Sequence, residues 1–254
     1  MSKMLFLSIV LVLFLGVNSS FCRGNPQEES TGSSDEYIYP VRPGTKQWKQ
    51  FKNAAEKRAA CQIPTETLKK MSTRGVVDSC INHPLGGEIL FYNSLEQGFL
   101  AMVSNFNVFK ELLAREDSGT ELLMIYQKMD PEEIREKKLK KGTKDWLLLK
   151  YFLIELLLSR PEIIENLSGS ERLELISRAY RTYTLKEKYP KTYGFIGTIA
   201  CLAIMKRVMQ KEGVLPPDTE TEKRDVYRDY AGIKDSHIKF ILSRAWKFIR
   251  DRKK

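Results

Sequence analysis

The sequence predicts an all-α protein built from irregular stacked helical hairpins, either a HEAT-like α-α superhelix or a compact multi-helix bundle. Apolar residues recur three and four positions apart along most of the chain, which is the period of a helix with one buried face. Short polar caps stand before these runs, and no stretch alternates apolar and polar residues as a sheet requires. With 254 residues, 42% of them hydrophobic, the chain can bury a core.

The first residues have the layout of a secretory signal peptide. Lys3 precedes an apolar stretch over residues 5–17, and small polar residues follow it. Because spanning a bilayer takes about 20 residues of helix, we favour a cleavable signal over an uncleaved N-terminal anchor. A lipoprotein acylated at Cys22 is a second alternative, although Phe21 stands where a small residue is normally required. We expect residues 1–22 to be a signal peptide of a secreted or cell-envelope-associated protein.

Three further segments follow the predicted signal peptide. Residues 23–38 are rich in Ser, Glu and Gly and contain little to bury, so we expect a flexible spacer. The helical domain is expected over residues 39–213, where two prolines and a glycine form an extended lead-in to the first helical pattern. Residues 214–254 are expected to form a linker and a basic amphipathic C-terminal helix.

Capping signals place the helices in order along the chain. Thr45 stands before the first helix, and Asp130, which a proline follows, begins another. Ser94, Ser118 and Ser168 each precede Gln or Glu by three residues, the spacing of a capping box. We expect helices at residues 45–61, 65–71, 73–82, 95–105, 107–115, 119–129, 131–140, 144–158, 161–166, 169–188, 192–211, 222–230 and 236–252.

The cysteines and an aromatic set are expected to be core material. Cys61 and Cys80 lie on neighbouring predicted helices and a disulfide between them is possible in an exported protein, but we favour three buried free thiols, including Cys201. No cysteine or histidine spacing indicates zinc. The helical spacing of the aromatic set favours a core over a binding groove. Its members are Phe91, Tyr92, Phe99, Phe106 and Phe109.

The sequence contains few groups suited to catalysis. His83 precedes a proline at a helix end and His237 lies at the start of the last helix, and neither has an identified partner. The carboxylate pairs at 116–117 and 132–133 fall at helix starts, where negative charge stabilises the helix dipole. Residues 85–88 contain two glycines but lack the lysine of a phosphate-binding loop, so we expect a turn. We expect no catalytic site, metal or cofactor.

Positive charge is concentrated in the C-terminal helix of a chain whose net charge is +10. A free helix of this kind can lie on an acidic membrane, and its deletion would then abolish vesicle binding and leave the rest folded. We favour the alternative in which its apolar stripe docks on the domain and its cations face water. The candidate contacts with an anionic surface are Lys239, Lys247, Arg250, Arg252, Lys253 and Lys254.

Five motifs extend this picture by resemblance. They are Tyr39-Pro40-Val41-Arg42-Pro43-Gly44-Thr45 with Trp48, Cys61-Gln62-Ile63-Pro64, Asn82-His83-Pro84-Leu85, Tyr92-Asn93-Ser94-Leu95-Glu96-Gln97-Gly98-Phe99 and Glu111-Leu112-Leu113-Ala114-Arg115-Glu116-Asp117. The chain resembles, from about Tyr39 to Gly213, a group of uncharacterised secreted helical proteins of gut Bacteroidetes and their relatives. The resemblance implies export and a helical architecture. It implies no activity, and members of the group carry tyrosine at the position of His83.

Taken together, these features predict an exported, non-enzymatic helical protein that presents its surface to a protein or to an anionic envelope polymer. The charge favours such partners, and no aromatic and basic pattern marks a nucleic-acid-binding module. A peripheral membrane or cell-wall binder that uses the C-terminal helix is the first alternative. A hydrolase with a site assembled from residues distant in the sequence is the second.

Overall fold

A computed structural model of the chain describes residues 35–136, 141–216 and 233–252. Within these ranges every regular element is a helix, which confirms the all-α prediction. The elements are α2 (Lys46–Gln50), α3 (Ala54–Ala60), α4 (Thr65–Lys70), α5 (Thr73–Ile81), the 3-10 helix η1 (Gly86–Phe91), α6 (Leu95–Asn105), α7 (Asn107–Ala114), α8 (Ser118–Lys128), α9 (Glu133–Glu136), α10 (Lys141–Leu158), α11 (Pro161–Asn166), α12 (Gly169–Glu187), α13 (Pro190–Tyr193), α14 (Ile196–Lys211) and α15 (Asp235–Arg252). A HEAT-like repeat stays a prediction.

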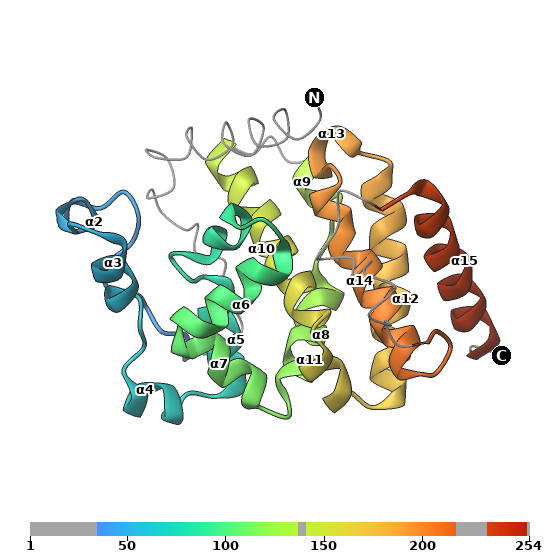
Figure 1. The fold of residues 1–254 in the computed structure, drawn as a ribbon, viewed down its shortest axis with the longest axis horizontal. Coiled ribbons are helices and arrows are strands. Elements are labelled where there is room, and N and C mark those ends of the chain that lie inside the picture. Colours follow the sequence, from blue (N-terminus) through green and yellow to red (C-terminus); the bar gives the residue numbers. More distant parts are fainter. Residues whose placement is uncertain (1–34, 137–140, 217–232, 253–254) are drawn as a thin grey trace.

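The helices are arranged along the long axis of the molecule, with α2 at one end and α15 at the other (Figure 1). Apolar side chains from Tyr39 to Ile249 pack into one buried cluster that runs through this series. The C-terminal helix contributes to the same cluster as the predicted helical domain. Residues 233–252 therefore pack as part of the domain that we expected to end at residue 213.

The helices α12 and α14 form an antiparallel pair on which α15 is placed. Arg172, in the first turn of α12, bonds to Glu212 at the end of α14, with Nε and Oε1 2.6 Å apart. Lys186, near the end of α12, donates to the carbonyl oxygen of Gly197 in the first turn of α14 at 2.8 Å. Arg252, at the end of α15, also bonds to Glu212. The end of α15 therefore lies near the start of α12, and α15 is antiparallel to α12.

Most of the predicted helix caps form, and one does not. The hydroxyl groups of Thr45 and Ser94 accept from the backbone amides three residues on, at 3.2 and 3.1 Å. Ser168 and Glu171 form a complete capping box at the start of α12. The capping box at Ser118 is wrong, because this residue is the first of α8 and its hydroxyl donates to the carbonyl oxygen of Arg115 at 2.8 Å.

Several helices differ from the predicted ones. The helix expected at 45–61 is divided, because the side chain of Asn53 accepts from the amide of Glu56 and starts α3. The turn expected at 85–88 opens the helix η1. The helix expected at 192–211 starts late, because Gly194 has a positive φ of 56° that ends α13. The helix expected at 222–230 lies outside the described residues.

The end of the expected spacer packs on α5. The Asp35 carboxylate accepts from the amide and the hydroxyl of Ser72, at 2.6 and 2.5 Å, and the amide of Tyr37 donates to Ser79 Oγ at 2.9 Å. Gly75 leaves room for this segment, since a Cβ there would lie 2.1 Å from Asp35 Oδ1. Asp35 and Tyr37, which we expected to belong to the flexible spacer, thus contact the helical domain.

The expected core residues are mostly buried. Cys61, Cys80 and Cys201 are buried free thiols, as expected, and burial raises the pKa of Cys61 to about 12. Of the aromatic set, Phe99, Phe106 and Phe109 are buried. The other two members differ from the prediction, because Phe91, the last residue of η1, and Tyr92, which follows it, are 57% and 36% exposed.

Candidate functional site

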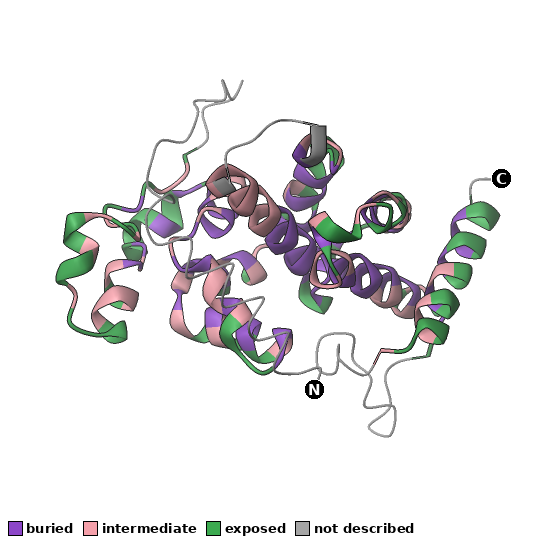
Figure 2. Ribbon diagram, turned by 90° about the horizontal axis from the view of Figure 1, so that it is seen from above, coloured by how far each residue is buried: buried purple, intermediate pink, exposed green. Residues whose placement is uncertain are grey.

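The C-terminal helix α15 separates its apolar and basic residues onto opposite sides. Ile241, Ala245, Phe248 and Ile249 are buried against the rest of the molecule. Figure 2 shows the same division along the helix, with buried residues toward the other helices and exposed residues away from them. This is the docked arrangement that we favoured, in which the helix uses its apolar stripe to hold itself on the domain.

The side of α15 that faces away from the domain combines basic and aromatic residues. From Lys239 to Arg250, six exposed residues fall within an arc of about 120°, because successive residues of a helix are about 100° apart. We define these residues as the outer face of α15. They are Lys239, Phe240, Ser243, Trp246, Lys247 and Arg250.

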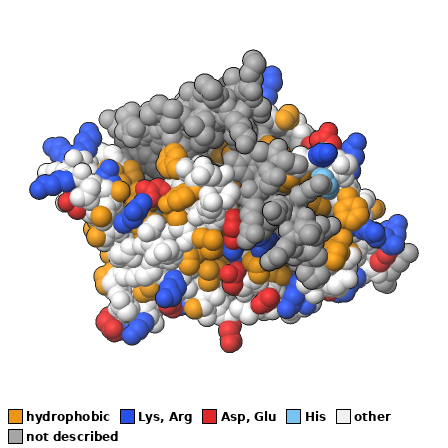
Figure 3. Space-filling view, viewed as in Figure 1, with side chains coloured by type: hydrophobic (Ala, Val, Ile, Leu, Met, Phe, Trp, Pro, Cys, Tyr) orange, Lys and Arg blue, Asp and Glu red, His pale blue; other side chains and the backbone are white. Residues whose placement is uncertain are grey.

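Two aromatic side chains mark the edges of this outer face. Phe240 is 47% exposed and Trp246 is 52% exposed. The Arg244 guanidinium carbon lies 5.4 Å from the ring centroid of Phe240. The ring centroid of Trp246 lies 5.8 Å from that of Tyr180 on α12. Figure 3 shows apolar and basic side chains next to one another at the end of the molecule where α15 lies.

Four of the six predicted basic residues lie within the described chain, and the structure gives them two different roles. Lys239, Lys247 and Arg250 are on the outer face, although Arg250 also pairs with its exposed neighbour Asp251 at 3.1 Å. Arg252 instead bonds to Glu212, with Nη1 and Oε2 2.7 Å apart, and anchors the helix. The remaining two, Lys253 and Lys254, lie outside the described residues.

The anchor of α15 is a carboxylate shared by two arginines. Glu212, whose side chain is 7% exposed, bonds through Oε1 to Arg172 of α12 and through Oε2 to Arg252 of α15. Both carboxylate oxygens of this nearly buried group are thereby bonded, which offsets the cost of removing its charge from water. The bridge fixes the end of α15 on the α12–α14 pair.

His83, one of the two histidines that the sequence analysis considered, has a structural position. The amide of Leu85 donates to Nδ1 at 3.2 Å, so the proton is on Nε2, which lies 3.3 Å from the carbonyl oxygen of Cys61. The ring contacts Tyr39, Phe106 and Phe109. Burial lowers the pKa of His83 to about 3, against a small opposite effect of the Cys61 hydrogen bond.

A buried ionic cluster lies between α10, α12 and α14, and the sequence did not predict it. Lys186 Nζ is 2.7 Å from both carboxylate oxygens of Glu155, and the two side chains are 1% and 0% exposed. The Cys201 thiol lies 3.4 Å from Glu155 Oε1. Burial lowers the pKa of Lys186, but the charge and hydrogen bonds of Glu155, together with Cys201, outweigh burial. The net direction is upward, and the ammonium form is stabilised.

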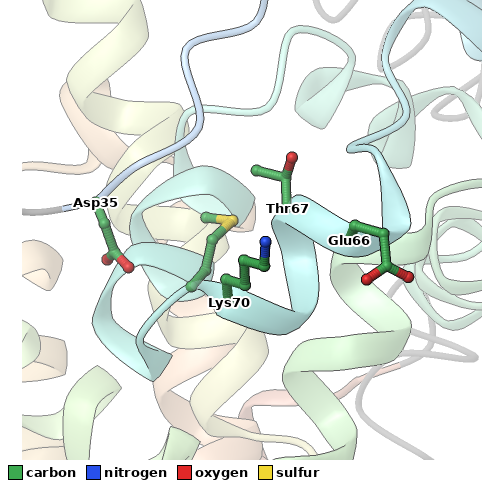
Figure 4. A pocket seen from close by; sticks show the side chains of 5 residues that line it. Asp35, Glu66, Thr67 and Lys70 are labelled. Atoms are coloured by element: carbon green, nitrogen blue, oxygen red, sulfur yellow. The ribbon is translucent and has the colours of Figure 1, made fainter.

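A shallow hollow lies beside α4, and Figure 4 shows Asp35 and Glu66 on opposite sides of it, with Thr67 and Lys70 between them. Met71 completes its lining. The pKa of Asp35 is lowered by its hydrogen bonds to Ser72. We interpret Asp35 as a clamp that holds the N-terminal segment on α5, since both of its oxygens are used in that contact.

The described part of the chain contains neither a metal site nor a membrane-spanning helix. Among residues 35–136, 141–216 and 233–252, no group of three His, Cys, Asp or Glu side chains is arranged to hold a metal ion. None of the described helices combines the length and the apolar composition that crossing a membrane requires. No protein-family model, no curated protein and no solved structure matches the chain.

Proposed function

We propose that this protein is exported and acts without catalysis, by binding an anionic component of the cell envelope through the outer face of α15. One observation carries the proposal: α15 uses its apolar stripe to dock, and Lys239, Lys247 and Arg250 stay exposed together on the opposite side. Cations that are gathered on one face of a fixed helix attract polyanions without ordering a flexible segment first.

The net charge of the chain favours the same class of partner. With a net charge of +10, the whole molecule attracts polyanions over distances that salt shortens to about 8 Å at physiological ionic strength. The binding is therefore expected to weaken as salt is added. Export is supported by the pattern of residues 1–22, which lie outside the described part of the chain.

A role without catalysis is supported by the contacts of three buried titratable groups, each of which bonds within the core. Both ring nitrogens of His83 face backbone groups. Glu155 and Lys186 neutralise one another in the core, where they pack between helices. These side chains stabilise the fold in their observed positions, so we assign them structural roles.

Charge reversal on the outer face tests the proposal. The variant Lys239→Glu/Lys247→Glu/Arg250→Glu is compared with the parent chain for binding to immobilised inorganic polyphosphate at low salt. A Lys or Arg near an anionic surface contributes about 1 kcal/mol, so the loss of three lowers the affinity by about 100-fold. Added salt should weaken binding of the parent chain much more than binding of this variant.

A matched control separates the position of the charges from their number. The variant Lys46→Glu/Lys49→Glu/Lys52→Glu reverses three exposed lysines in and next to α2, at the other end of the molecule. Each reversal replaces one positive charge with one negative charge, so both variants lower the net charge of +10 by six. Equal losses in the two variants would refute a site on α15.

A further inference from the structure

We propose that the anionic partner of α15 is a lipid membrane surface, with the edge aromatics Phe240 and Trp246 inserted among the headgroups. This inference rests on the proposed function, because it requires the outer face of α15 to bind anions. It adds the chemical class of the partner, an assembly that offers both negative charge and an apolar layer.

The order of residues around the helix supports a membrane over a soluble polyanion. Counted at about 100° per residue, the arc of the outer face begins at Trp246 and ends at Phe240. The three cations, Lys239, Lys247 and Arg250, lie between these two edges. Cations flanked by aromatic rings match the boundary of an acidic membrane, where charged headgroups lie above the first apolar groups.

The exposure of the two aromatic rings is the second argument. About half of each side chain faces water, at 47% for Phe240 and 52% for Trp246, although both lie on a well-packed helix. A soluble polyanion gains nothing from such apolar area. A tryptophan ring with one apolar face and an N–H group is well suited to the interface between lipid and water.

Docking of α15 determines how deep the contact can be. The stripe that a free amphipathic helix would insert, which includes Ile241, Phe248 and Ile249, is buried in the protein. Only the outer face is available, and its apolar part is confined to its two edges. We infer a shallow contact in which Trp246 and Phe240 reach the headgroup level and the helix stays on the domain.

A fluorescence experiment tests the contact at Trp246 itself. The full chain with Trp48→Phe and Trp146→Phe retains Trp246 as its single tryptophan. We expect a blue shift of its emission, and quenching by brominated acyl chains, with mixed phosphatidylcholine and phosphatidylglycerol vesicles at low salt. Pure phosphatidylcholine vesicles should cause neither effect. An unchanged spectrum with the acidic vesicles would overturn the proposal, whatever the rest of the chain does.

A pair of variants tests the apolar contribution separately from charge. Phe240→Ser/Trp246→Ser should lower the partition onto the acidic vesicles on the order of tenfold. The variant removes the apolar area that membrane binding would bury and keeps every cation. The matched control is Leu100→Ser/Met124→Ser, which removes two other exposed apolar side chains, 54% and 39% exposed, and should leave vesicle binding unchanged.

Binding to inorganic polyphosphate distinguishes failure of this inference from failure of the proposed function. Phe240→Ser/Trp246→Ser should bind polyphosphate as the parent chain does. If its vesicle binding is also unchanged, the lipid inference is wrong and the anion-binding function stands. If charge reversal on the outer face leaves polyphosphate binding unchanged, the proposed function is wrong and the lipid inference fails with it.

Discussion

The hydrogen bonds of His83 require a neutral ring in the folded protein. Nδ1 accepts the amide proton of Leu85, so a proton on this nitrogen would break that bond and place a charge in a buried aromatic environment. The unfolded chain has no such restriction and binds a proton near pH 6.5, whereas the pKa of His83 in the fold is about 3. Between these values the unfolded state binds more protons, so folding stability falls as the pH falls.

His83→Gln should therefore remove part of the acid sensitivity of the protein. Each pH unit below 6.5 costs the parent chain about 1.4 kcal/mol through this group, or about 2 kcal/mol between pH 6.5 and pH 5. Urea unfolding at the two pH values measures the difference, which should be smaller in the variant by about this amount. His237→Gln, which changes the other histidine, is the comparison, and an equal loss of acid sensitivity in both variants would not assign the effect to His83. Equal pH dependence in the parent and both variants would contradict the role of His83.

At the scale of elements, Gly98 permits α6 to approach η1. A Cβ on this residue would lie 2.2 Å from the carbonyl oxygen of Ile89, which is a backbone atom that cannot rotate away. Gly98→Ala should therefore separate the two elements and lower the free energy of unfolding by about 1–3 kcal/mol, as overpacking typically does. Urea unfolding measures the effect.

The control for Gly98→Ala is Gly169→Ala. Gly169 opens α12, is exposed, and has only the flexible Arg172 side chain near the position of a Cβ, at 3.9 Å. Because alanine favours the helix over glycine by up to about 1 kcal/mol, this variant should match or exceed the stability of the parent. Equal behaviour of the two alanine variants would show that the approach of α6 to η1 does not matter for stability.

Local signals in the sequence predicted most helices, and the two cap errors are local as well, because each involves residues only three positions apart. Ser168 and Glu171 formed the expected box because both partners lie within one turn. Ser118 has the same spacing, but its hydroxyl bonds to the preceding Arg115 carbonyl, which moves the helix start by one residue. Asn53 lies inside an otherwise helical apolar pattern, and its role as a cap at a break was missed.

The candidate site was predictable in part for the same reason. Helical periodicity placed Lys239, Lys247 and Arg250 on the face opposite the apolar stripe. It did not separate Arg252 from them, because the partner that anchors this residue, Glu212, lies 40 residues away. The pairing of Glu155 with Lys186 joins positions 31 residues apart, and no local pattern indicates it.

At the scale of the whole molecule, α15 shares one core with the rest of the chain, and this changes what its removal should do. We predicted this helix as a separate segment but favoured its docking on the domain, and its deletion without unfolding the remainder was expected for the membrane-bound alternative. In the structure Ile241, Phe248 and Ile249 are buried in the same cluster as α12 and α14. Fully burying one such side chain stabilises a protein by about 1.5–3 kcal/mol, a large part of a total stability of about 5–15 kcal/mol.

Ala245→Asp tests whether α15 and the domain unfold as one unit. Ala245 is fully buried on the inner side of α15, so a carboxylate at this position loses its contact with water and gains no ion-pair partner. The substitution should lower the free energy of unfolding by about 3 kcal/mol. Ser243→Asp places the same charge on the outer face and should leave the unfolding midpoint unchanged. With Trp246 as the single tryptophan, its fluorescence follows α15 and far-UV circular dichroism follows all helices. If α15 shares the core, both transitions shift together to lower urea in Ala245→Asp. A fluorescence transition that precedes the dichroism transition would show instead that α15 unfolds separately from the domain.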